Sequence, residues 1–186
     1  DECLRSAMPF FSQVIVVDTG STDSTKKIVL SRGAELREIA WPNSFAEARN
    51  ESLRGAAGKW IFWMDADDTL PPLCGMAVLQ AAIKADPTVS GFVLPVRFVD
   101  EGPHSGVQVD HVKLFRNLPG LEFEGRIHEQ ILPSLRCLMP KGAIARLDAY
   151  VLHSGYDTSP EGQAKKNARD RQLLSLDLEE RPGHPF

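Results

Sequence analysis

The sequence lacks the features that mark several classes of protein. No apolar stretch approaches the roughly 20 residues that a membrane-spanning helix needs. Basic residues are scattered without a run, and the formal net charge is −4 at pH 7. An acidic balance without a basic patch gives no electrostatic reason to expect nucleic-acid binding. We therefore expect no transmembrane segment and no nucleic-acid partner.

Cysteine is also scarce. Cys3, Cys74 and Cys137 are odd in number and far apart, so they have neither the spacing of zinc ligands nor that of a disulfide framework. They are expected to be buried thiols in a reducing compartment. The 186 residues, 42% of them hydrophobic, are enough for one domain with a sizeable core.

Apolar runs alternate with helical patterns in the first half of the chain. The run at 13–17 is too uniformly apolar for a half-exposed strand, which favours a sheet covered on both faces. The order strand–helix–strand–helix–strand favours an α/β fold with right-handed crossovers. The patterns predict a short helix at 3–10, strands at 13–17, 34–39 and 60–64, and helices at 24–32 and 45–57.

The second half predicts a different arrangement. A helix at 74–85 precedes two strands, 91–99 and 110–116, which we expect to be joined by a hairpin loop. Residues 143–153 carry another strand, and a capping signal at Ser159 begins a helix that runs to about Glu180.

The most informative stretch is the apolar strand Trp60–Met64, which runs directly into Asp65, Asp67 and Asp68. Three carboxylates within four residues repel one another, which is costly unless they are solvated or bind a cation. Mg²⁺ and Mn²⁺ prefer oxygen ligands and usually bridge to substrate phosphates. In open α/β sheets ligands bind at the carboxyl ends of strands. The stretch therefore predicts a metal-and-phosphate site.

Two other polar stretches have both a functional and a structural interpretation. Asp18, Gly20 and Ser21 follow a strand and precede a helix, so they could contact a base or ribose, or form an ordinary turn with helix caps. Arg49 lies in the middle of a predicted helix, where it could pair with a phosphate or lie on a solvated face.

Two histidine-containing stretches are equally open. His128 and Glu129 form a compact acid/base pair beside Arg126, which could serve in proton transfer or could be exposed and without a catalytic role. His153 ends an apolar strand, where a lone histidine is more often a hydrogen-bonded core residue than a ligand.

The acidic stretch, taken by itself, resembles the sequence motif of one family. An apolar strand that runs into DxDxT resembles the first motif of haloacid-dehalogenase-type phosphatases, in which Asp65 would be the nucleophile and Asp67 would handle protons beside Mg²⁺. That motif normally opens the domain, whereas two strand–helix units precede it here. Lys141 is a weak candidate for the later lysine of that family.

A second resemblance covers the whole chain, from Asp1 to Phe186. VIVVDTGSTDST, FAEARNESLRGAAGKWIFWMDADDTL, VKLFRN, GRIHEQI and a strand ending in HSGY follow one another in the order of glycosyltransferase family 2. They are similar to a bacterial subgroup whose final helix often leads into tetratricopeptide repeats. The resemblance implies an α/β fold of the GT-A type, a Rossmann-like mixed sheet with helices on both faces.

The resemblance also implies a domain organisation. The family's first strand should precede Asp1, so residues 1–157 are expected to be an N-terminally truncated GT-A domain. Residues 158–186 are expected to be a C-terminal helix that begins a further helical region.

For the chemistry, the resemblance implies inverting transfer of a sugar from a nucleoside-diphosphate sugar to an acceptor hydroxyl with a divalent metal, Mn²⁺ or Mg²⁺. Glu129 is our hypothesis for the base that takes the acceptor's proton. Asp67 is the expected direct metal ligand, with Asp68 as a support or alternative ligand and His153 as a further ligand. The expected contacts to the nucleotide-sugar are Asp18, Gly20, Ser21, Arg49, Asp65 and Arg126.

The family default for the donor is a UDP-sugar. The acceptor could be a saccharide, a lipid-linked molecule or a protein. The expected location is cytoplasmic, including a peripheral one at the inner face of the membrane. A non-catalytic binding domain of the same fold is the remaining alternative, against which the intact acidic residues argue.

Overall fold

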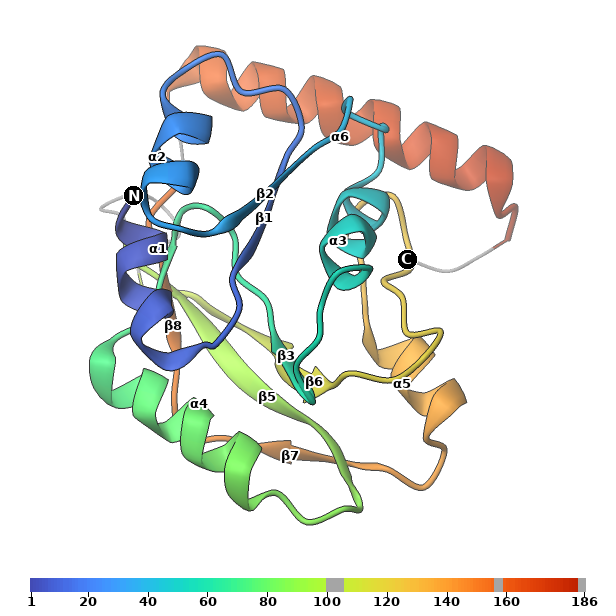
Figure 1. Cartoon of the computed structure of the whole chain (residues 1–186). Coiled ribbons are helices and arrows are strands. Elements are labelled where there is room, and N and C mark those ends of the chain that lie inside the picture. Colours follow the sequence, from blue (N-terminus) through green and yellow to red (C-terminus); the bar gives the residue numbers. More distant parts are fainter. Residues whose placement is uncertain (100–105, 156–158, 184–186) are drawn as a thin grey trace.

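The computed structural model describes residues 1–99, 106–155 and 159–183, and its strands form two separate sheets (Figure 1). The small sheet is a parallel pair of β1 (Ile15–Asp18) and β2 (Glu35–Glu38). The large, six-stranded sheet has the order β3–β6–β5–β8–β4, and β7 also pairs with β5. Its strands are β3 (Trp60–Phe62), β4 (Asp68–Thr69), β5 (Val89–Phe98), β6 (Gln108–Arg116), β7 (Ala143–Arg146) and β8 (Val151–His153).

The large sheet is mixed. The long strands β5 and β6 are antiparallel, β3 is antiparallel to β6, and β7 and β8 are both parallel to β5. The short strand β4 is antiparallel to β8, with Asp68 opposite His153. This last pairing matters most for function, because it brings the acidic stretch against a histidine from the end of the fold.

Two helices begin with a serine whose hydroxyl caps the first turn. Ser44 accepts a hydrogen bond from the N–H of Glu47, and Ser159 accepts one from the N–H of Gly162. The helices are α1 (Glu2–Ala7), α2 (Thr25–Ser31), α3 (Phe45–Leu53), α4 (Pro72–Lys84), α5 (Leu132–Leu138) and α6 (Pro160–Glu180), and a 3₁₀ turn covers Met8–Phe10.

Helices cover both faces of the large sheet, as predicted. On one face, Val78 of α4 packs in a buried cluster with Leu94 and Val151. On the other face, Ala46 of α3 and Leu135 of α5 pack with strand residues in a second cluster. Figure 1 shows α6, in red, running across the molecule on the side of α3, away from α4.

The structure differs from the predicted elements in three places. Strand β3 pairs with β6 and not with β1 or β2, so the parallel crossover holds only for the small sheet. The strand predicted at 143–153 is two strands, because β7 pairs with the beginning of β5 and β8 with its end. Helix α5 lies outside the predicted elements, since it spans only seven residues and has Pro133 in its first turn.

A cavity of about 650 Å³ lies between the two sheets. It is lined by residues 15–17 of β1 and 60–62 of β3, which explains why β1 is only half-buried although its side chains are apolar. The small sheet packs against α1 and α2 in a cluster of its own, which contains Leu4, Val29 and Ala34. A further strand before Asp1 stays a prediction.

Some predictions lie outside the described residues. These are part of the hairpin loop after β5, Tyr156 of the HSGY stretch, and the domain boundary at 157 and 158. Within the described part of the chain, none of the helices combines the length and the apolar character that crossing a membrane requires.

Candidate active site

Asp18 ends β1 and is almost fully buried. Its Oδ1 accepts hydrogen bonds from the N–H groups of Gly20 (3.0 Å) and Ser21 (2.9 Å). Burial opposes ionisation, but the hydrogen bonds from Ser21 and Gly20 outweigh it and hold the pKa of Asp18 below its usual value. Among buried side-chain oxygens and nitrogens of the described residues, only its Oδ2 has no hydrogen-bond partner. A buried carboxylate oxygen without a donor points to a ligand that supplies one.

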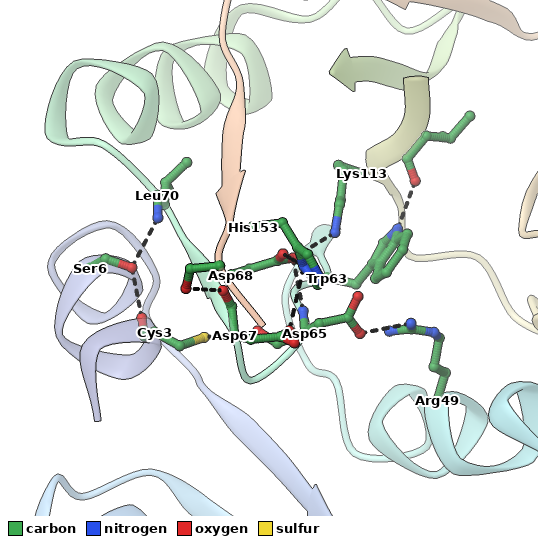
Figure 2. A network of polar contacts seen from close by, with 12 residues as sticks. Cys3, Ser6, Arg49, Trp63, Asp65, Asp67, Asp68, Leu70, Lys113 and His153 are labelled. Carbon is green, nitrogen blue, oxygen red and sulfur yellow. Dashed lines mark hydrogen bonds and ion pairs between the residues drawn. The ribbon is translucent and has the colours of Figure 1, made fainter. Parts of the chain in front are cut away.

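The acidic stretch forms a turn, and His153 meets it from β8 (Figure 2). Asp65, Asp67, Asp68 and His153 can each offer a ligand atom within 4.8 Å of the others. Carboxylate oxygens and an imidazole nitrogen suit a divalent ion such as Mn²⁺. The structure therefore brings the four residues of the predicted metal-and-phosphate site into one cluster.

The members of this cluster are not equivalent. Asp68 is buried, and its Oδ1 lies 2.9 Å from Nδ1 of His153. Its Oδ2 accepts from Nζ of Lys113 (2.8 Å) and from the N–H of Asp65 (2.9 Å). Burial alone would raise the pKa of Asp68, but His153 and Lys113 together lower it to about 2. A direct bond from Asp68 to the metal stays an untested prediction, which these contacts do not favour.

Asp67 is the carboxylate that faces outward. Its main-chain carbonyl accepts from the N–H and Oγ of Ser154, at 3.1 and 3.2 Å. Its Oδ1 lies 3.5 Å from Nδ1 of His153, and no arginine or lysine among the described residues pairs with its side chain. Burial raises the pKa of this carboxyl. A bound cation would lower this pKa again, and the role of Asp67 as a direct metal ligand stays a prediction.

Gly155 leaves the room that the Asp67 side chain occupies. A Cβ at Gly155 would lie 1.8 Å from Oδ2 of Asp67. We therefore expect Gly155→Ala to displace this flexible carboxylate while the fold persists, and to weaken Mn²⁺ binding about 10-fold or more. Titration with Mn²⁺ followed by paramagnetic resonance measures this, with the melting temperature as a check on folding. An unchanged affinity would contradict the placement of Asp67 as a ligand.

Arg49 of α3 joins two predicted site residues. Its Nε lies 2.5 Å from Oε1 of Glu129, and its Nη2 lies 2.8 Å from Oδ1 of Asp65. The guanidinium also stacks over the ring of Trp63, 4.1 Å from its centre. Arg49 therefore fixes the two carboxylates relative to each other, and its use as a direct nucleotide contact stays a prediction.

Glu129 lies in a tightly held loop. His128, just before it, has φ of +54°, which a non-glycine residue rarely adopts and which the surroundings must enforce. The carbonyl of Arg126 accepts from the N–H of Phe45, and the N–H of Arg126 donates to Oδ1 of the buried Asp177 on α6. Helix α6 thus supports the loop that carries the predicted base.

Arg126 itself turns away from the cluster. Its guanidinium pairs with Glu180 of α6 and donates to the carbonyl of Asn43 at 2.9 Å. Contact with the diphosphate stays a prediction that this geometry does not favour. The contacts of Arg126 instead tie the Glu129 loop to α6.

The cavity between the sheets is lined by two residues of the predicted site and by neighbours of others. Its lining includes Thr19 beside Asp18, the aromatic Trp41, and then Arg49 and Asp65. A volume of about 650 Å³ is within the range of small-molecule sites. The space between the sheets therefore extends from the neighbour of Asp18 to one member of the acidic cluster.

Three residues around the cluster were not predicted to matter. Trp63 donates from Nε1 to the carbonyl of Val112, and both Arg49 and Lys113 lie over its ring. His111 contacts the edge of Trp63, and burial, with the charge of Lys113, lowers its pKa. His111 and Lys113 alternate with apolar residues along β6, a pattern that predicts a strand but does not indicate contact with the acidic turn.

The three cysteines differ, and the expectation that all are buried is wrong for Cys137, which is exposed. Cys3 donates from Sγ to the carbonyl of Asp65, and burial, with the charge of Asp68, raises its pKa to about 11. At pH 8 its thiolate fraction should therefore be about 10⁻³. We expect a disulfide reagent to modify Cys137 rapidly and Cys3 slowly, as measured by mass spectrometry over time. Comparable rates would show that the acidic turn opens readily.

Comparison with known proteins decides the family. Residues 1–145 match the family model described as glycosyl transferase family 2. The chain belongs to this family. The curated relatives of the chain include the prophage-derived glycosyltransferase SunS of Bacillus subtilis, 27% identical over an alignment of 191 residues that covers 99% of this chain and 43% of SunS.

A TPR repeat-containing protein of Synechococcus elongatus is 31% identical over 186 residues, which cover 97% of this chain and 45% of that protein. Both are consistent with the predicted resemblance to family 2 enzymes that carry tetratricopeptide repeats. The chain spans less than half the length of these curated relatives.

Solved structures show the same fold. Glucosyl-3-phosphoglycerate synthase from Mycobacterium tuberculosis, crystallised with Mn²⁺, UDP-glucose and phosphoglyceric acid, aligns with a TM-score of 0.59 and 18% identity. The alignment covers 98% of this chain and 74% of that one. The predicted GT-A fold of family 2 is confirmed.

Proposed function

We propose that this chain transfers a glycosyl group from a nucleoside-diphosphate sugar to an acceptor hydroxyl, with a divalent metal and with inversion. One observation carries the proposal. One cavity is lined both by Thr19, next to the buried and donorless carboxylate oxygen of Asp18, and by Asp65, a member of the cluster with metal-ligand chemistry. A nucleotide joined to a diphosphate needs these two features at its two ends.

The end of the site at Asp18 fits a nucleobase. Oδ2 of Asp18 can accept from an N–H donor, which every nucleobase carries on the edge that pairs with other bases, for example N3–H of uracil. Gly20 and Ser21 act through their N–H groups, which hold Oδ1 and so orient Oδ2. The M. tuberculosis enzyme was crystallised with UDP-glucose, so we propose a UDP-sugar as donor.

The other end fits a divalent cation. Asp67 and the ring nitrogen of His153 that faces away from Asp68 would bind the ion, with Asp65 close enough to join. When bound, the ion would stabilise the charge that develops on the leaving diphosphate. The M. tuberculosis structure contains Mn²⁺, which makes Mn²⁺ the first ion to test here.

Glu129 is the residue we assign to the acceptor. Its pairing with Arg49 uses Oε1, which leaves Oε2 to take the proton of an acceptor hydroxyl. A single base and a metal-bound leaving group suffice for one displacement, which inverts the anomeric carbon. The proposal covers a saccharide, a lipid-linked molecule or a protein as acceptor, since each can present a hydroxyl.

The phosphatase alternative loses its main support. Asp65 would have to be a nucleophile, yet it is held in an ion pair with Arg49 at 2.8 Å. The family match points the same way. A non-catalytic domain remains the alternative for the experiment to decide.

A donor panel tests the proposal. The full-length protein is incubated with Mn²⁺ and a series of UDP-, GDP- and dTDP-sugars, and release of the nucleoside diphosphate is followed with and without candidate acceptors. We expect one UDP-sugar to be consumed, and chelation of the metal to stop the reaction. Hydrolysis of p-nitrophenyl phosphate that depends on Asp65, or binding of no nucleotide at all, would overturn the proposal.

A further inference from the structure

Lys113 lies in the middle of β6 with only 1% of its surface exposed. A buried ammonium is costly unless it is paired and hydrogen-bonded. Here Nζ lies 2.8 Å from Oδ2 of Asp68 and 3.6 Å from the centre of the Trp63 ring. Figure 2 shows the side chain of Lys113 directed at the carboxylate of Asp68. Lys113 therefore provides a buried positive charge in direct contact with the acidic cluster.

Asp68 connects Lys113 to two other groups through hydrogen bonds. The oxygen that accepts from Lys113 also accepts from the N–H of Asp65, which closes the turn. The other oxygen accepts from Nδ1 of His153. Since an ionised carboxylate can only accept, Nδ1 must carry a proton, and in the neutral ring Nε2 then has the free lone pair.

We infer that Lys113 is a positioning residue for the metal site, an inference that rests on the proposed function for its purpose. Lys113 holds Asp68 as a support behind the turn and not as a ligand. Through Asp68 it fixes the tautomer and the orientation of His153, so that Nε2 is the nitrogen presented to the cation.

The charges agree with this assignment. Asp68 is paired with Lys113, and Asp65 shares Arg49 with Glu129, so two of the three carboxylates of the turn have a cationic partner. Within the described part of the chain, Asp67 has no lysine or arginine partner. These ion pairs hold the turn in place and reduce the repulsion among its carboxylates, while the carboxylate of Asp67 stays available for the cation.

The test replaces the pair in two steps. Lys113→Met keeps the length of the side chain but leaves Asp68 as an unpaired buried charge, so this variant alone could fail to fold. The double variant Lys113→Met with Asp68→Asn removes both charges, which proteins tolerate better. The new amide then offers one acceptor oxygen to two donors, the N–H of Asp65 and Nδ1–H of His153. Lys141→Met, at an exposed lysine, is the matched control.

Two readouts are needed on the full-length protein. The first is Mn²⁺ affinity in the presence of UDP, for which we expect a loss of about 10- to 100-fold in the double variant and none in Lys141→Met. The second is the ¹⁵N spectrum of His153 at pH 9 without metal, where we expect the Nδ1–H tautomer in the wild type and a mixture in the double variant.

The outcomes separate this inference from the proposed function. Unchanged Mn²⁺ affinity in the double variant, or an Nε2–H tautomer in the wild type, would overturn the role of Lys113. If the wild type binds no Mn²⁺ in the presence of UDP, the proposed function is wrong, and Lys113 then has no metal site to position. The tautomer measurement still decides in that case whether Lys113 and Asp68 orient His153.

Discussion

Replacing Asp67 by asparagine should reduce metal-dependent sugar transfer by about 10³-fold. The amide removes a negative charge from the outward-facing carboxylate, with which no lysine or arginine of the described residues pairs. A metal ion contributes several kcal/mol of charge stabilisation in the transition state, and each 1.36 kcal/mol is a factor of ten in rate. The measurement is the turnover number with the preferred donor across a range of Mn²⁺ concentrations.

The fold should tolerate Asp67→Asn, because this side chain is partly exposed and its main-chain bonds to Ser154 remain. Asp148→Asn, at an exposed position before β8, is the matched control and should keep full activity. Activity of Asp67→Asn that is close to that of the wild type at low Mn²⁺ would remove Asp67 from the metal site.

Replacing Glu129 by glutamine should slow transfer by about 10²- to 10⁴-fold while donor binding stays near its wild-type value. Glutamine can still accept from Nε of Arg49, so the loop and the Arg49–Asp65 pair should remain in place. It cannot take the acceptor's proton, so the loss should appear in the turnover number and not in the affinity for UDP.

Two comparisons make this result specific. Glu124→Gln, an exposed glutamate of the same segment, should leave transfer unchanged, since its paired contacts with Gln130 are made by the main chain. If Glu129→Gln abolishes UDP binding instead, Glu129 serves to hold Arg49 and Asp65, and the base lies elsewhere.

Local patterns in the sequence predicted the elements well, because caps, apolar runs and the acidic stretch act over a few residues. Ser44 and Ser159 cap the predicted helices, and the apolar run beginning at Trp60 is a strand. Pairing between distant strands could not be predicted in the same way. The antiparallel contact of β4 with β8 depends on residues far apart in the chain, and it is what carries His153 to Asp68.

The same limit applies to the site residues. The family resemblance predicted Arg49 as a nucleotide contact, which stays untested, but its partners Asp65 and Glu129 could not be predicted because they come from other parts of the chain. The same holds for Arg126, whose ion pair with Glu180 of α6 directs its side chain away from the cluster and could not be predicted from its neighbours in the sequence. The position of Lys113 in an alternating strand gives no sign of its role, which only its burial against the acidic turn reveals.

The most direct test of the account is the position of the metal. Crystals of the protein grown with Mn²⁺ and UDP should show an anomalous scattering peak bonded to the carboxylate of Asp67 and to Nε2 of His153. The account predicts that Asp68 stays bonded to Lys113 and makes no bond to the ion. A peak bonded to Asp68, or Mn²⁺ bound with UDP at another part of the chain, would contradict it.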